Sequence, residues 1–500
     1  MTWSNILTYQ TKIKKKHNLD LLVGYEINSK ESDGLGTTIS NFARWDKPEV
    51  NNGVVYQSMG GSNSTTRIVS YITRANYDYD NKYYLGASWR TDGSSRLARE
   101  NRWGNFWSLS GAWRVSSESF MKPLQNWLSD LKLRVSYGVN GTLPSSYYGY
   151  MGLSSLTSNY NDNPGITQSQ LENKELTWET NYNFNSGIDL GFFDNRLNVT
   201  FEYYVRTTKN LLYSRPLSLA TGFSSYLANI GKLQNKGYEL EIRSTNIETK
   251  DFRWSTSLNL GHNANKILKL DGDLKQVTSG TSIHKVGLPY STYYMIEFAG
   301  IDPVDGEPMF YKNTTDENGN LNKETTKDPR SAEKVILQCA DPTITGGLGN
   351  SISYKWFDLN FNVNFSFGAW NYDGAAGKLE HGGDGTLNIP IYYRKRWQKE
   401  GDETSIERFV VGRSISMTDY ATTRRLYSGD YVRLKNLTFG FTLPKTWTRK
   451  VGIDNIRLYA SGNNLLTWAA YDYIDPESGS SPSWDTPPMR TYTFGLEVKF

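Results

Sequence analysis

Apolar and polar residues alternate along most of this chain with the period of two that defines a β-strand. The clearest case is the C-terminal segment, whose apolar face carries Tyr492, Phe494, Leu496, Val498 and Phe500. A regular strand that ends on an aromatic residue is typical of the closing strand of a bacterial outer-membrane β-barrel. A soluble β-sandwich can also end on such a strand, so this segment alone leaves both folds open.

The segment 357–368 extends the alternation, with an apolar side chain at every odd position from Phe357 to Phe367. Such a length is unusual in a soluble sheet and suits a tilted strand that crosses a membrane. Shorter alternating segments lie at 83–90, 107–115, 132–137, 197–205, 238–243 and 437–443. We therefore predict an all-β protein, a transmembrane antiparallel β-barrel.

The polar faces of these segments carry charged residues in mid-strand. A water-filled barrel interior accepts such charges, and the dry core of a sandwich does not. A sheet face in contact with solvent would accept them as well, so the charges do not decide between the folds. They are Lys132, Arg134, Glu202, Glu239, Glu241 and Arg243.

The expected connections alternate between short and long. Short turns are expected near 78–82, 194–196, 248–251 and 354–356, and long connections near 138–176, 208–236, 368–430 and 467–490. Outer-membrane barrels show this asymmetry, with short periplasmic turns and longer extracellular loops. Counting strands alternately up and down gives roughly 16–17 strands. The count requires a hairpin formed by 293–299 and 307–312, and a helical turn is expected within 117–130.

Composition narrows the class of protein further. No stretch approaches the length of apolar sequence that a transmembrane helix needs. The 34 Tyr and 15 Trp suit membrane interfaces, and a net charge of +4 gives no basis for nucleic-acid binding. The single cysteine, Cys339, excludes an internal disulfide.

Met1 is followed directly by a strand-like segment without a signal peptide, so we expect a trimmed chain or one that begins inside a larger protein.

Residues that carry catalysis or bind metals are scattered rather than grouped. The four histidines, His17, His262, His284 and His381, lack metal-ligand spacing. The segment 316–320 has the composition of a hairpin turn and lacks the distal glutamate of a calcium loop. We therefore expect no enzyme activity, no catalytic residue, no metal and no cofactor.

Aromatic residues gather in the long connections. Their rings can stack on sugar rings or on peptide side chains. Packing within the loops, a membrane-interface girdle and contact with a lid protein are the alternatives. The candidate ligand contacts are Tyr148, Trp370, Tyr372, Trp397, Trp468, Tyr471 and Trp484.

An ordered set of sequence boxes covers nearly the whole chain. They include R-T-D-G-S-S-R at 90–96, L-T-W-E-T-N at 176–181, N-I-G-K-L-Q-N-K-G-Y-E-L at 229–240, A-G-I-D-P-V-D-G-E-P at 299–308 and S-G-D-Y-V-R-L-K-N-L at 428–437. With these boxes the chain resembles the C-terminal barrel portion of the SusC/RagA-type TonB-dependent transporters of the Bacteroidetes outer membrane.

The resemblance implies a plug domain, a TonB box and a barrel of about 22 strands, more than this chain contains. Residues 1–500 are therefore expected to form the C-terminal part of such a barrel, without the plug and the first strands. The resemblance also implies TonB-dependent import of oligosaccharides or oligopeptides across the outer membrane of a Gram-negative cell. Implied partners are a SusD-like surface lipoprotein, the TonB complex through the missing N-terminal region, and outer-membrane lipid.

Other functions remain open at this point. The chain could be a passive porin-like or structural outer-membrane barrel, a non-functional barrel fragment, or a soluble carbohydrate-binding β-protein. The predicted closing strand, Tyr492 to Phe500, would pair with a first strand that lies outside this chain.

Overall fold

A computed structural model describes residues 1–161, 163–270, 272, 274–317, 319–383, 388–412, 420–471, 473–478 and 488–500. Its main element is a 15-stranded sheet, and every strand pair whose register is described in it is antiparallel. In sheet order the strands are β1 (Thr2–Ile13), β2 (His17–Phe42), β3 (Gly53–Tyr79), β4 (Tyr83–Ser94), β5 (Trp103–Arg114), β6 (Leu128–Thr142), β9 (Glu179–Phe192), β10 (Leu197–Lys209), β13 (Lys232–Glu248), β14 (Phe252–Lys269), β22 (Ile344–Tyr354), β23 (Phe357–Phe367), β26 (Tyr431–Thr442), β27 (Asn455–Ala469) and β28 (Thr491–Lys499).

Five small sheets lie in the connections. Their strands are β7 (Leu153–Tyr160) with β8 (Asn163–Gln170); β11 (Leu212–Pro216) with β12 (Ser225–Asn229); β15 (Gln276–Ser279), β16 (Ser282–Lys285), β17 (Thr292–Ile296) and β21 (Lys334–Cys339); β18 (Phe298–Ile301), β19 (Pro308–Tyr311) and β20 (Thr325–Thr326); and β24 (Trp370–Tyr372) with β25 (Leu426–Ser428). Two short α-helices are described, α1 (Gly374–Leu379) and α2 (Lys445–Thr448).

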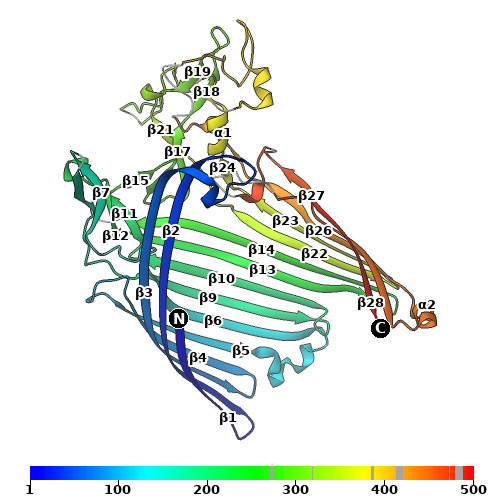
Figure 1. The fold of residues 1–500 in the computed structure, drawn as a ribbon. Coiled ribbons are helices and arrows are strands. Elements are labelled where there is room, and N and C mark those ends of the chain that lie inside the picture. The colour runs from blue at the N-terminus through cyan, green and yellow to red at the C-terminus, as the bar shows by residue number, and fades with distance from the viewer. Residues whose placement is uncertain are drawn as a thin grey trace. The chain divides into compact units, whose positions relative to one another are not determined.

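The chain divides into two compact units. The first comprises Met1–Glu118, Leu133–Ser186 and Val205–Leu233, and the second Ser119–Lys132, Gly187–Tyr204 and Gln234–Phe500. In the first unit β2 and β3 form a hairpin of 26 and 27 residues, much longer than the neighbouring strands (Figure 1). Strand β1 pairs with β2 only up to Asn28, and β4 pairs with β3 only from Ile68 onward. The distal half of the hairpin is therefore a two-stranded ribbon with two free edges.

In the second unit β22, β23, β26, β27 and β28 lie side by side in chain order (Figure 1). Strand β23 follows the predicted segment 357–368 within one residue, and its Phe357 pairs with Phe441 of β26. Strand β28 pairs with β27, from Asn455 with Lys499 to Asn463 with Thr491. The terminal strand predicted from the sequence is thus confirmed as a strand of the large sheet.

Short turns of two to four residues join β1 to β2, β3 to β4, β9 to β10, β13 to β14 and β22 to β23. Two further connections, 115–127 and 443–454, are longer and contain short helical segments. The pairs Lys14–Lys15 and Asp80–Asn81 both have φ between 48° and 60°, the left-handed conformation of a type I′ turn. This turn matches the twist of the flanking strands, which explains the uninterrupted registers on either side. Long connections occupy the other ends, so the predicted alternation of short and long connections is confirmed.

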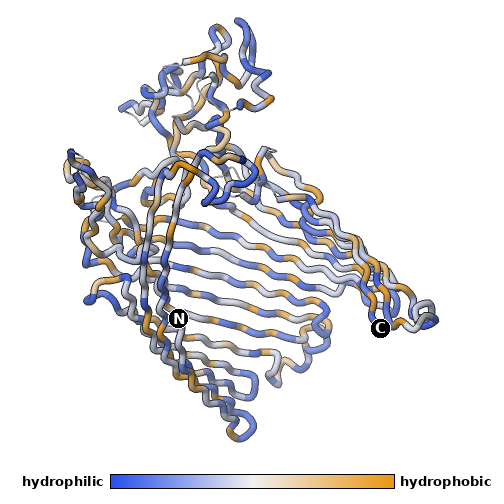
Figure 2. The backbone as a smooth tube through the Cα atoms, in the orientation of Figure 1, coloured by the Kyte–Doolittle hydropathy of each residue, from blue (hydrophilic) through white to orange (hydrophobic). Residues whose placement is uncertain are grey.

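The apolar face of the large sheet is exposed rather than packed on a core. In the first unit Leu85 is 62% exposed and Leu109 56%, and in the second unit Phe439 is 48% exposed. Figure 2 shows hydrophobic and hydrophilic residues alternating along these strands. A soluble sandwich would bury this face, whereas a sheet in a bilayer presents it to lipid. The exposure therefore opposes the soluble sandwich reading.

Two details differ from the sequence prediction. The large sheet has 15 strands, whereas roughly 16–17 were expected. The hairpin expected between 293–299 and 307–312 was wrong in its first strand: Thr292–Ile296 (β17) pairs with β21, and it is Phe298–Ile301 (β18) that pairs with β19, in a separate small sheet. The large sheet does not need it, because β14 pairs directly with β22 in antiparallel register. The expected helical turn is confirmed as two 3₁₀ segments, Val115–Ser117 and Ser119–Leu124.

Candidate ligand-binding surfaces

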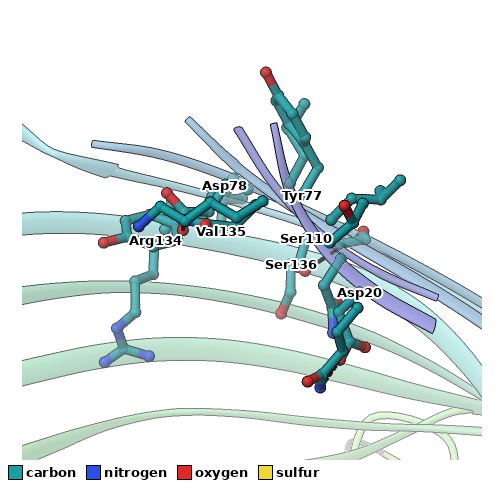
Figure 3. A pocket seen from close by; sticks show the side chains of 18 of the residues that line it. Asp20, Tyr77, Asp78, Ser110, Arg134, Val135 and Ser136 are labelled. Atoms are coloured by element: carbon teal, nitrogen blue, oxygen red, sulfur yellow. Dashed lines mark hydrogen bonds between the residues drawn. The ribbon is translucent and has the colours of Figure 1, made fainter. Parts of the chain in front are cut away.

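A hollow of about 870 Å³ lies among the strands β1 to β6 of the first unit. Figure 3 shows Asp20 and Arg134 extending to one side of the strands and Tyr77 to the other. The register agrees: Asp20 pairs with Asn76 and with Gln10, so these three side chains share the polar face. The polar side of the hollow is lined by Gln10, Lys12, Asn18, Asp20, Asn76, Asp78, Ser110, Arg134, Ser136 and Asn185.

The two carboxylates that line this hollow accept hydrogen bonds from neighbouring amide and guanidinium groups. Asp20 accepts hydrogen bonds from Gln10 at 2.6 Å and from Arg74 at 3.4 Å. Asp78 accepts from the Asn18 side chain at 2.6 Å and from the backbone N–H of Asn81 at 2.7 Å. Both groups thus act as acceptors that order the strands and the turn. The surface they form offers hydrogen bonds to a polar solute rather than acid–base chemistry.

The polar face of the second unit has a hollow of about 650 Å³. Gly347 of β22 pairs with Asn259 on one side and with Asn364 on the other. Because glycine has no side chain, its backbone is open to the hollow between the two carboxamides. Carboxylates, carboxamides and hydroxyls predominate here: Thr200, Glu202, Glu239, Glu241, Asn259, Thr345, Asn364 and Ser366. The mid-strand charges predicted at Glu202, Glu239 and Glu241 therefore lie together on one polar wall.

The long connection between β23 and β26 builds a separate platform in the second unit. Strand β24 pairs with β25, which sets Trp370 opposite Ser428 and Tyr372 opposite Leu426. Asp373 then caps α1 by accepting a hydrogen bond from the backbone N–H of Ala376 at 2.7 Å. Local pairing and capping thus give this loop a fixed shape without continuing the large sheet.

Buried ion pairs join distant parts of this platform. Arg424 contacts Glu407 and lies 3.6 Å from Glu380, while Arg425 lies 3.3 Å from Glu380. The Tyr393 hydroxyl donates to Glu407 at 3.0 Å, and the Tyr392 hydroxyl donates to Glu380. Glu407 and Arg425 are almost fully buried. Since a buried charge is costly without its partner, this network favours a single arrangement of the residues around Glu380, Tyr393, Glu407 and Arg424.

Five tyrosines form a row along the platform. Tyr471 stacks on Tyr427 with ring centroids 3.5 Å apart, and Tyr473 lies 5.3 Å from both Tyr471 and Tyr392, which contacts Tyr393. Burial, followed by nearby carboxylates, raises the pKa of Tyr392, Tyr393, Tyr427 and Tyr471, so these hydroxyls stay protonated. Tyr473, in the middle of the row, is 69% exposed. The row therefore presents an accessible aromatic surface on a rigid base.

The predicted aromatic residues of the second unit have different surroundings. Tyr471 belongs to the tyrosine row, and Trp370 and Tyr372 are half-buried in β24 beside it. Trp397 donates through its indole N–H to the Pro303 carbonyl at 3.0 Å, and its ring covers Gly306. Trp468 is 58% exposed on the apolar face, two residues from the equally placed Leu466, as in an interface girdle. Trp484 lies outside the described residues.

Tyr148 of the first unit is tied to β3, where its hydroxyl accepts from the backbone N–H of Thr65 at 2.9 Å. Tyr150, two residues further along the chain, packs against a buried cluster that includes Leu97, Phe106, Leu176 and Trp178. The sequence box at 176–181 supplies Leu176 and Trp178 of this cluster, and Leu97 directly follows the box at 90–96. None of these placements tests ligand binding, so the aromatic contacts stay a prediction.

The aspartates in the turns after Ala299 already have partners within the protein, either a lysine or a backbone N–H. Lys327 bridges Asp302 at 2.6 Å and Asp305 at 2.7 Å, and Asp316 accepts from the backbone of Asn320 at 2.7 Å. In the part of the chain that the structure describes, no group of His, Cys, Asp and Glu could hold a metal ion. No described helix is long and apolar enough to span a bilayer.

Sequence reasoning missed the residues that organise the platform. Glu380, Glu407, Arg424, Arg425 and Tyr427 lie in a connection without periodicity, and their partners are up to 45 residues away. The adjacent arginines within an aromatic-rich loop were the one available signal. A pair of buried arginines requires carboxylates, but the sequence does not say which ones.

Long antiparallel strands with an exposed apolar face, a polar opposite face and alternating short and long connections define the outer-membrane β-barrel class. Residues 2–465 match the family described as "TonB dependent receptor-like, beta-barrel". The chain belongs to this family, which is one of receptors and transporters rather than enzymes.

Curated relatives and solved structures agree with this membership. TonB-dependent receptor P3 of Formosa agariphila is 34% identical over 537 residues, covering 99% of this chain and 52% of the relative. TonB-dependent receptor SusC of Bacteroides thetaiotaomicron is 30% identical over 461 residues, covering 87% of this chain and 44% of the relative. The structure of the RagAB peptide transporter matches all of this chain and 55% of that chain, with 29% identity and a TM-score of 0.85. The chain spans about half the length of the curated relatives it matches.

Proposed function

We propose that the intact protein imports an oligosaccharide or an oligopeptide across the outer membrane of a Gram-negative cell, with energy from TonB. Residues 1–500 supply the C-terminal part of its barrel. The observation that carries this proposal is the sheet itself, whose apolar face is exposed and whose polar face is lined by amides, hydroxyls and charges. The similarity to SusC and to the RagAB peptide transporter supports the same class of cargo.

The polar walls suit the passage of a hydrogen-bonding solute. Amide and hydroxyl side chains of β14, β22 and β23 exchange hydrogen bonds with a moving solute without leaving a buried group unpaired. No bond is made or broken in this process. Direction comes from energy delivered through the TonB complex, which acts through an N-terminal region that the longer relatives have room for.

The tyrosine row is the proposed capture surface. The exposed Tyr473 and the half-buried Tyr471 present ring faces that stack on sugar rings or on aromatic peptide side chains. The ion pairs of Arg424 and Arg425 hold this surface in shape before the ligand arrives, which lowers the ordering cost of binding.

A SusD-like surface lipoprotein is the proposed lid over the long connections. Apolar side chains are exposed in this connection, with Ile391 75% and Val411 80% exposed. Exposed apolar residues of this kind mark protein interaction sites. The similarity to SusC, whose family the sequence boxes indicated, supports a lipoprotein partner here.

Uptake measurements test the proposal. Deleting the gene should abolish growth on one class of glycan or peptide, and the wild-type gene should restore it. A Tyr473→Ala variant should restore surface expression but bind the cargo several-fold more weakly, whereas Trp468→Ala should bind as wild type. Unchanged growth on every glycan and peptide source would contradict the importer. A stable open conductance without TonB would instead favour the passive porin-like barrel.

A further inference from the structure

The turn between β1 and β2 carries three consecutive lysines. Lys14 and Lys15 occupy its central positions with φ of 48° and 60°, and Lys16 follows. Asn, Asp and Gly are the residues that such left-handed positions favour. Turn geometry therefore does not explain lysine here, and all three side chains are exposed.

Two of these charges are not neutralised by the protein. Lys16 lies 3.6 Å from Asp80 of the adjacent turn. No ion pair is described for Lys14 or Lys15 within residues 1–161. The tip of the hairpin therefore presents a net positive charge to its surroundings.

A row of aromatic rings on the apolar face runs just inside this turn. His17 meets Tyr79 edge-on at 5.0 Å, Tyr79 stacks with Tyr83 at 6.3 Å, and Tyr83 stacks with Trp113 at 6.4 Å. The Tyr83 hydroxyl and the Trp113 indole N–H both donate to Glu118, at 2.6 and 3.3 Å. Tyr and Trp that are apolar on one side and hydrogen-bonded on the other mark the bilayer interface.

The position of this aromatic row sets how deeply Lys14 and Lys15 lie in the bilayer interface. Lys15 and Lys14 lie two and three residues from His17 toward the turn tip, on the side away from the apolar strand interior. At about 3.3 Å per residue, their ammonium groups reach the level of lipid phosphates when the aromatic row lies at the interface.

The second unit repeats the arrangement independently. Lys355 occupies the turn between β22 and β23 with φ of 53°, and its ammonium lies 5.4 Å from the ring centre of Tyr354. Tyr354 and Trp356 are 51% and 46% exposed. A left-handed turn lysine beside exposed aromatic residues thus occurs at a short turn of each unit.

We propose that the Lys14–Lys15 turn binds the phosphate of anionic phospholipid headgroups in the leaflet on the short-turn side. This inference rests on the proposed membrane placement and adds a lipid partner to it. Ammonium groups bind phosphate as point charges, and each lysine near an anionic surface raises partitioning by a factor of about five.

Lipid retention by the intact protein tests the inference. The protein is reconstituted in vesicles of phosphatidylcholine with a minority of phosphatidylglycerol, extracted in mild detergent, and its retained lipids are counted by native mass spectrometry. Wild type should retain phosphatidylglycerol in excess over its share of the vesicle. The variant Lys14→Gln/Lys15→Gln should lose on the order of tenfold of that enrichment.

The matched control removes two exposed lysines far from this turn, Lys30 in the middle of β2 and Lys47 in the β2–β3 connection, as Lys30→Gln/Lys47→Gln. It should retain the enrichment of wild type. Equal enrichment in the turn variant, or an equal loss in the control, would overturn the inference while leaving the importer intact. A wild-type protein that fails to enter vesicles would instead overturn the proposed membrane function.

Discussion

The ring of Tyr471 lies flat on the ring of Tyr427, with centroids 3.5 Å apart and an angle of 19° between the planes. Tyr471 follows β27 and Tyr427 belongs to β25, so the stack joins the β27–β28 connection to the platform. The Tyr471 hydroxyl extends the join to Asp373 at 3.4 Å. The Tyr427 hydroxyl, by contrast, is buried without a hydrogen-bond partner among the described residues.

This difference predicts opposite outcomes for two changes at one residue. Tyr427→Phe keeps the stack and removes an unsatisfied hydroxyl, so the free energy of unfolding should stay equal or rise by about 1 kcal/mol. Tyr427→Ala removes the ring and should lower the free energy of unfolding. Because Tyr427 is half-buried, the loss should be smaller than the roughly 3–5 kcal/mol expected for removing a fully buried ring. Thermal unfolding in detergent measures both. A clear loss in Tyr427→Phe would show that the hydroxyl has a partner.

Arg433 holds the connection after β27 in place. Its guanidinium lies 2.6 Å from both Asp475 and Glu477, and its side chain is only 3% exposed. Arg433→Met should leave Asp475 without its cation and Glu477 with Lys435 alone, and it should open residues 473–478 at a cost of about 3 kcal/mol. Amide hydrogen exchange of this segment measures the opening. Lys435→Gln, which removes the more exposed contact to Glu477, should cost about 1 kcal/mol or less.

Acid should loosen the connection that contains Asp302 and Asp305. The hydrogen bonds from Lys327 lower the pKa of both carboxyls below 3.8, and the same contacts raise the pKa of Lys327 above 10.5. Because the carboxyl pKa values are lowered on folding, their contribution is present above pH 3.8 and is lost as the pH falls through the folded-state values. The lysine contribution is lost only above pH 10.5. The protection of residues 300–312 against hydrogen exchange, taken relative to the intrinsic exchange rate at each pH, should therefore fall in acid.

The variant Lys327→Gln serves as the control for this pH dependence. It should show faster exchange already at neutral pH and a smaller change on acidification, because the carboxyls have lost the donor that lowers their pKa. The pair formed by Arg408 and Glu307 lies nearby and remains in the variant. An acid response of unchanged size in Lys327→Gln would assign the effect to that pair instead.

Gly495 gives the terminal strand its close packing. A Cβ at this position would lie 2.2 Å from the ring of Tyr459, its partner on β27. Gly495→Leu should therefore strain the strand by about 1–3 kcal/mol and lower the folded fraction, read as the heat-modifiable band on gels. Thr493→Val on the same face should fold as wild type. Adding Tyr459→Ala to Gly495→Leu should restore folding if the clash is the cause.

Regular strands could be predicted from the sequence because their signal is local. Phe357–Phe367 and the terminal strand carry their period in adjacent residues, and the structure has them within one residue of the prediction. The long connection between β14 and β22, which contains β17 to β21, could not be predicted in the same way. Its short strands pair with one another in small sheets. Counting strands alternately up and down therefore placed an extra hairpin in the large sheet, which is not there.

The platform could be predicted only as a place rich in aromatics. Its shape depends on contacts such as Arg425 with Glu380, whose positions in the chain follow no period. Trp397 shows the same limit, because its surroundings depend on Gly306, a residue distant in sequence that leaves room for the ring. Side-chain chemistry identified the region, and tertiary packing decided which residues became its base.

The two-stranded ribbon formed by the distal halves of β2 and β3 is suited to presenting a foreign peptide on the cell surface. A strand of 26 residues is more than twice the roughly 9–11 residues that a tilted strand needs to cross a bilayer. Its outer half is rich in Ser, Gly, Thr and Asn, has two free edges and supports no other strand. A peptide inserted near Asp46 should therefore be carried outside the cell on a stiff, self-contained stalk, accessible to an antibody, while the sheet below keeps its registers.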